Sequence, residues 1–165
     1  MLMLQGRTNR LLIITSTLII SLGAISKLIP LFVIGIVMMV NNYKKTFNPI
    51  SKDSIYNPEL QRQTAYILFI LAILEGITGF GAGPQTSTFI TVMTLGLLNR
   101  GNSLELHLIL IAPLAFFFIL HSTSGLGNLL LRKGVKSKAI YSYVLPLAML
   151  TLFAIAFYLD TLYFF

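Results

Sequence analysis

LELHLILIAPLAFFFILHSTSGLGNLLLRK, residues 104 to 133, is the longest apolar stretch of the chain. After Glu105 it carries no Asp, Glu, Lys or Arg until Arg132. An α-helix rises 1.5 Å per residue, so about 20 apolar residues cross the ~30 Å hydrocarbon core of a bilayer. Residues 104–131 therefore predict a membrane-crossing helix, which is followed by a basic loop.

Two further apolar runs resemble the first. Residues 64–81 precede a glycine-rich exit, and residues 139–159 contain Pro146. Each is long enough for one crossing. Together with an N-terminal run at 11–40, they predict about four transmembrane helices.

The N-terminal run is interrupted by Lys27 and Pro30. As one helix it would be about 45 Å long, which is too short for a two-pass hairpin. We expect a single tilted helix that is kinked at Pro30. The alternative is a span that ends near Lys27, followed by an interfacial or re-entrant piece at 31–40. The basic and apolar start also resembles a secretory signal, and we expect an uncleaved anchor.

The composition agrees with a membrane protein. Of the 165 residues, 56% are hydrophobic and only 10% are charged, whereas soluble domains carry roughly 25% charged residues. We therefore predict one all-α transmembrane domain over residues 1–165, in a multi-pass protein of an energy-transducing membrane. There is no cysteine, which excludes c-type haem, iron–sulfur clusters held by this chain and disulfides.

The net charge of +7 gathers at the ends of the apolar runs. This placement is typical of topology signals and of contact with anionic lipid, and it argues against nucleic-acid binding. The loops 41–63 and 132–138 hold most of the basic residues, so we expect both on the cytoplasmic side. The connection 82–103 holds only Arg100 and should lie on the other side. Helical spacing within it predicts a short helix lying flat at the interface.

The two histidines of the chain, His107 and His121, both lie in the third run. Fourteen residues separate them, so both rings share one helix face at levels about 21 Å apart. This spacing suits a helix that presents an axial imidazole to each of two stacked haems. The alternative is that neither histidine binds a cofactor, and that His107 contacts lipid headgroups near the end of its span.

An apolar helix with His-x13-His resembles respiratory cytochrome b and the smaller membrane-bound b-type cytochromes. The resemblance implies that His107 and His121 ligate haem iron, and that Gly125 and Gly127 let a macrocycle approach the backbone. Because no other histidine is present, the opposing ligands would be methionines or come from a second subunit. The candidate methionines are Met93 and Met149.

The segment His121-Ser-Thr-Ser-Gly125-Leu is also similar to the histidine helix of succinate dehydrogenase membrane anchors. In that family one haem b lies between two small subunits, and each subunit gives one histidine. This second resemblance implies that only His121 is a ligand, and that a partner chain supplies the other.

Glu75 lies inside the second apolar run. A carboxylate at membrane depth has a high free-energy cost, so such a residue is by default a functional candidate. It could pass protons to a quinone, line a proton path, or form a structural ion pair with Lys27. Lys27 could contact a haem propionate or a quinone carbonyl, or simply extend its ammonium group to the interface. Gly76 and Gly79 predict close helix packing rather than a phosphate loop.

These patterns predict a membrane subunit of a respiratory or other redox complex. It would bind b-type haem through His121 and His107 and pass electrons to or from the quinone pool, with other membrane subunits as partners. No catalytic residue set is evident, so it would be at most an electron-transfer subunit of an oxidoreductase. The alternatives are a cofactor-free accessory subunit of a large membrane complex, and a small transporter or proton-channel component built around Glu75 and Lys27.

Overall fold

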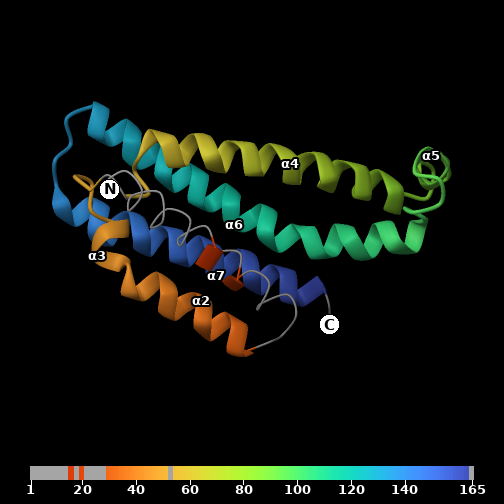
Figure 1. Ribbon diagram of the computed structural model, residues 1–165, viewed down its shortest axis with the longest axis horizontal. Helices are drawn as coiled ribbons and strands as arrows, with labels where there is room; N and C mark the ends of the chain where they lie inside the picture. Colours follow the sequence, from red (N-terminus) through yellow and green to blue (C-terminus); the bar gives the residue numbers. More distant parts are fainter. Residues whose placement is uncertain (1–14, 17–18, 21–28, 52–53, 164–165) are drawn as a thin grey trace, which may run out of the picture.

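The computed structural model describes residues 15–16, 19–20, 29–51 and 54–163, and every element within them is a helix (Figure 1). This confirms the predicted all-helical class. The elements are α2 (Ile29–Asn41), α3 (Tyr43–Thr46), α4 (Pro58–Ala82), α5 (Ser87–Met93), α6 (Arg100–Arg132), the π-helix η1 (Ile140–Val144) and α7 (Leu145–Tyr163).

Two helices of the described part, α4 and α6, are long and apolar enough to cross a membrane. The apolar stretch Ile140–Ala156, which includes the start of α7, is shorter. The predicted runs at 64–81, 104–131 and 139–159 thus each lie within helical structure. The helices α4 and α6 begin earlier than the apolar runs because asparagine caps start them. Asn57 accepts from the Glu59 N–H, and Asn99 accepts from the Asn102 N–H.

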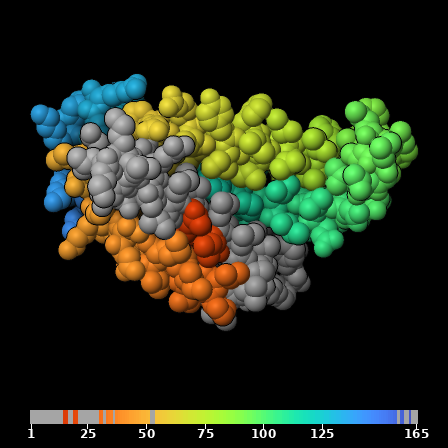
Figure 2. Space-filling model, in the orientation of Figure 1, coloured from red at the N-terminus to blue at the C-terminus, as the bar shows by residue number. Residues whose placement is uncertain are grey.

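The helices α4 and α6 run antiparallel along most of their length, and α7 packs beside α6 (Figure 1). At one end of this pair the short helix α5 forms the turn, and Figure 2 shows it projecting from the molecule. Arg100 closes this end, since its Nε donates to the Ala82 carbonyl at 3.3 Å. The ends of α4 and α6 near α5 extend past α7 (Figure 1).

The buried apolar core lies at the opposite end of the pair. It joins the segment before α4 to the middle of α6 and the start of α7, and its most buried members are Ile55, Leu60, Phe117, Leu120 and Tyr141. The short helix α3 and the connection between α6 and α7 both lie at this end (Figure 1). The two basic segments thus lie at one end of the fold and the 82–103 connection at the other (Figure 1), whereas the predicted placement of these ends on opposite sides of a membrane stays a prediction. The connection does contain a short helix, α5.

The N-terminal apolar run does not form the single kinked helix that was predicted. A Cβ added to Gly35 of α2 would lie 2.4 Å from Cγ1 of Ile20 and 2.8 Å from the Ser16 carbonyl oxygen. In one continuous helix, residues 20 and 35 would be about 22 Å apart. The two parts of the run therefore lie side by side. Pro30 stands in the first turn of α2, where its missing N–H leaves no helical bond unmade.

Pro146 explains the π-helix that precedes α7. Proline has no N–H, so it cannot donate to the carbonyl four residues before it, Ser142, or five residues before it, Tyr141. Two tyrosine hydroxyls replace the missing donor. The Tyr56 hydroxyl donates to the Tyr141 carbonyl at 2.6 Å, and the Tyr43 hydroxyl donates to the Ser142 carbonyl. These bonds join the segment before α4 to the last helix.

Candidate functional site between α4 and α6

The contacts between α4 and α6 follow one antiparallel register. Gly81 lies against Ser103, Gly79 against His107, Thr64 beside His121, and Gln61 against Gly125 and Asn128. On α6, residues 107, 121 and 128 are separated by multiples of seven, which is the repeat of a helix that faces a single partner helix. The fourteen-residue spacing of the histidines is two such repeats. Both histidines do share a face, and that face is turned to α4.

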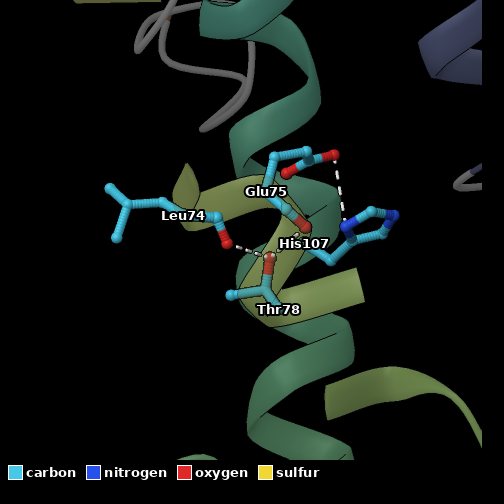
Figure 3. Close-up of polar contacts among 4 residues, drawn as sticks. All are labelled: Leu74, Glu75, Thr78 and His107. Atoms are coloured by element: carbon cyan, nitrogen blue, oxygen red, sulfur yellow. Dashed lines mark hydrogen bonds and ion pairs between the residues drawn. The ribbon is translucent and has the colours of Figure 1, made fainter. Parts of the chain in front are cut away.

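Glu75 and His107 form an ion-pair contact between the two helices. Oε1 of Glu75 lies 3.2 Å from Nδ1 of His107, and Figure 3 shows the two side chains turned toward one another. Gly79, one helical turn after Glu75, makes room for the imidazole, since a Cβ there would lie 3.2 Å from Cε1 of the ring. Thr78 satisfies its hydroxyl within α4, on the carbonyls of Leu74 at 2.8 Å and Glu75 at 3.2 Å.

The pair is mostly shielded from solvent and not fully satisfied. The Glu75 side chain is 15% exposed and that of His107 is 31% exposed. The 3.2 Å contact meets the distance of an ion pair but not the geometry of a hydrogen bond, so His107 Nδ1 is buried without a hydrogen-bond partner among the described residues. The other carboxylate oxygen, Glu75 Oε2, is also buried without one among them. Buried polar atoms of native proteins nearly always have partners. Oε2 therefore has an unused capacity to bind a proton or a donor.

The pair lies in the half of each helix that is nearer to α5. Glu75 is seven residues from Ala82, and His107 is seven residues from Arg100, so both are about 10 Å from the helix ends. Toward the basic end, the next titratable groups are Tyr66 on α4 and His121 on α6, whereas Glu105 lies two residues from His107 on the α5 side. Apolar residues thus separate the pair from the basic loops.

His121 belongs to a separate polar cluster near the basic end. Its Nδ1 lies 3.0 Å from Oγ1 of Thr64, and that hydroxyl is 3.0 Å from the carbonyls of both Leu60 and Gln61. A hydroxyl that donates to either carbonyl accepts from an Nδ1–H, which leaves the lone pair of the neutral imidazole on Nε2. Asn128 continues the cluster, because its Nδ2 donates to Oε1 of Gln61 at 3.2 Å.

The glycines expected to admit a haem near His121 are already in contact with protein. A Cβ on Gly127 would lie 2.1 Å from Cδ1 of Tyr56, and one on Gly125 would lie 2.6 Å from Nε2 of Gln61. The Tyr56 ring and the Gln61 side chain thus fill the space that a macrocycle would need on this face. The residues around His121 do not fit a haem in this arrangement. In the described part of the chain no group of three or more His, Cys, Asp or Glu residues could hold a metal ion.

The other sequence-predicted site residues lie apart from the pair. Met93 is 66% exposed on α5, and Met149 is buried in the core on α7. Lys27 falls outside the described residues, so its predicted pairing with Glu75 stays a prediction. Gly79 does serve close packing, as expected, whereas a Cβ on Gly76 would meet nothing within 4 Å.

Sequence reasoning did not select Gln61, Thr64 and Tyr56. The first two have a signal in the sequence. Together with Leu68, Leu71, Glu75 and Thr78 they recur at alternating steps of three and four residues, which marks the face of α4 that meets one partner helix. Tyr56 lies in a polar loop and carries no such signal.

Comparison with protein-family models, curated proteins and solved structures finds no match to this chain. The resemblance to b-type cytochromes and to succinate dehydrogenase anchors stays a prediction from the sequence.

Proposed function

We propose that the chain is a multi-pass helical membrane protein that transfers protons through the Glu75–His107 pair. Its surface supports insertion in a membrane. Only 11% of the most apolar window of α4 and 28% of that of α6 are buried within the fold, whereas the core helix of a soluble protein is mostly buried. Large apolar side chains are exposed along these helices, among them Phe69, Ile70, Phe80 and Phe118. Such a surface is typical of contact with lipid or with other membrane subunits.

The single observation that carries the proton-transfer proposal is the 3.2 Å contact between Glu75 and His107. The pair is neutral whether the proton is on the carboxylate or on the imidazole, so one proton can move between them without a net charge change in the apolar region. Imidazole exchanges protons near neutral pH, and carboxylate–histidine chains are a recurring form of intramembrane proton relay. Oε2 and Nε2 would be the atoms that receive and release the proton.

Proton flux through the purified chain in proteoliposomes tests the proposal. A potassium gradient with valinomycin would drive the flux, and a trapped pH-sensitive dye would report it. We expect Glu75→Gln and His107→Gln each to lower the flux at least tenfold, since each substitution removes one of the two proton-binding groups. Glu105→Gln is the matched control for the carboxylate, because Glu105 is exposed on the same helix as His107. His121→Gln is the control for the imidazole.

Circular dichroism and gel filtration must first show that the variants keep the helical content and size of the wild type. If folded Glu75→Gln and His107→Gln conduct protons at the wild-type rate, the pair has a structural role and the proposal is wrong. An infrared carboxyl band that titrates in the wild type and is missing only in Glu75→Gln would support proton binding at this site independently of flux.

A second candidate function is haem ligation by His107, and the same contact favours it. Metal-bound histidines commonly place their other ring nitrogen against a carboxylate, which fixes the ring and raises its basicity. With Nδ1 facing Glu75, Nε2 of His107 is the atom left for iron, and the opposing ligand would come from a partner subunit. A visible absorption spectrum of the protein purified from its native membrane distinguishes the candidates. A reduced b-type band that disappears in His107→Gln would favour the haem.

A further inference from the structure

The structure contains an apolar groove between α2 and α7 that neither proposed function uses. Its volume is about 260 Å³. The floor consists of buried side chains and the rim of exposed ones: Phe47, Phe116 and Met149 are at most 5% exposed, whereas Val40 is 63% and Leu150 is 55% exposed. Among the described residues, a buried floor with an exposed rim leaves the groove accessible at its rim.

The shape of the groove follows the axis of α7. Pro146, Met149, Leu150 and Phe153 line it at steps of three, one and three residues, which is one stripe of a helix about 10 Å long. The tyrosine in the lining, Tyr43, donates its hydroxyl to the Ser142 carbonyl. The groove therefore offers an apolar stripe of α7 about 10 Å long, and the Tyr43 hydroxyl is not free to face it.

One end of the groove carries positive charge. Tyr43 and Phe47, which line that end together with Pro146, flank Lys44 and Lys45 in the sequence, and both lysines are exposed on α3. The other basic loop, with Lys133 and Lys136, lies at the same end of the molecule (Figure 1). An apolar groove with exposed lysines beside one end is complementary to one amphiphile, a lipid whose headgroup is negatively charged and whose acyl chain places its first part in the groove.

We propose that this groove binds one acyl chain of an anionic phospholipid, whose phosphate contacts Lys44 and Lys45. The chain would lie along α7 toward Phe153. A lysine near an anionic lipid surface contributes roughly a five-fold increase in affinity. The two lysines together should therefore favour an anionic lipid over a zwitterionic lipid by about 25-fold. The site rests on the proposed membrane insertion and does not depend on proton transfer.

Native mass spectrometry of the purified full chain in detergent tests the site, with phosphatidylglycerol and phosphatidylcholine as the probes. The wild type should retain one phosphatidylglycerol preferentially, and Lys44→Gln/Lys45→Gln should lose that preference by about 25-fold. Lys133→Gln/Lys136→Gln is the charge control. An equal loss in that control would overturn the site, because general attraction at the basic end would then explain the binding.

Two matched variants test whether the acyl chain lies in the groove. Leu150→Trp places a large ring across the groove, whereas Leu147→Trp adds the same ring at a residue of α7 that is 66% exposed and outside the lining. We expect only Leu150→Trp to weaken phosphatidylglycerol binding. Binding of glycerol phosphate without acyl chains, or displacement of the lipid by a short-tailed quinone that binds more tightly, would overturn the assignment. Proton flux in proteoliposomes is measured separately, so failure of one proposal leaves the other standing.

Discussion

Replacing Gly127 by alanine should destabilise the fold through a single added methyl group. That Cβ would lie 2.1 Å from Cδ1 and 2.5 Å from Cε1 of Tyr56, whereas carbon atoms in contact prefer about 3.5–4.0 Å. The Tyr56 ring, which is 3% exposed, would have to move by more than an ångström. Its hydroxyl would then leave the Tyr141 carbonyl, which is 2.6 Å away in the wild type.

The expected change in the free energy of unfolding has two unfavourable contributions and one smaller favourable contribution. Overpacking of a core typically costs about 1–3 kcal/mol, and a buried carbonyl left without its donor costs about 1–3 kcal/mol. Alanine returns up to about 1 kcal/mol as the better helix former. The net expectation is a loss of roughly 2–4 kcal/mol.

Gly76→Ala provides the matched control, because a Cβ on Gly76 of α4 would meet nothing within 4 Å. That variant should gain up to about 1 kcal/mol from helix propensity. Thermal unfolding in detergent, followed by helical circular dichroism, should separate the melting temperatures of the two variants by roughly 4–20 °C. Equal shifts in the same direction would show that the Tyr56 ring is not packed on Gly127.

Three further outcomes follow from other parts of the fold. Burial, with Tyr43 and Tyr141 nearby, raises the pKa of Tyr56 above its ordinary value of 10.0. Because the hydroxyl ionises more readily in the unfolded chain, its contribution to the free energy of unfolding is complete below pH 10 and should decline as the pH rises further. The decline should be smaller in Tyr56→Phe. Single cysteines at Ser137 and Asn99 should react with an impermeant thiol reagent from opposite sides of an oriented vesicle, and labelling from the same side would contradict the arrangement of the loops. Gly79→Val should push the His107 ring away from Glu75 and lower proton flux, whereas Gly76→Val, on the open face of the same helix, should leave the flux near the wild-type value.

The helices of this protein were predictable because their cause is local. Apolar runs of membrane-crossing length marked α4, α6 and the region of α7, and basic residues at the run ends marked the loops that share one end of the fold. The structure of the N-terminal run was not predicted correctly by the same pattern. Its length and Pro30 are compatible with either a kinked helix or two adjacent pieces, and only the contact of Ile20 with Gly35 distinguishes them.

The candidate site was predictable in its members but not in its pairing. Periodicity places His107 and His121 on one face of a helix, but it does not say which surface that face meets. The partner depends on the register between α4 and α6, which aligns Glu75 with His107 and Thr64 with His121. Glu75 was identified as a functional candidate from its burial cost alone, whereas its partner lies 32 residues further along the chain.

The two tyrosine hydroxyls that serve the carbonyls before Pro146 also set an order of assembly. Tyr56 and Tyr43 bond to residues 85 and 99 positions later in the chain. A ribosome makes proteins from the N-terminus, so those carbonyls do not yet exist when the residues of α4 and α6 have been made. The pair of α4 and α6 can form first, before the Tyr43 and Tyr56 hydroxyls have their acceptors. The segment that begins the last helix, once made, is then what holds α3 and the residues just before α4 in place.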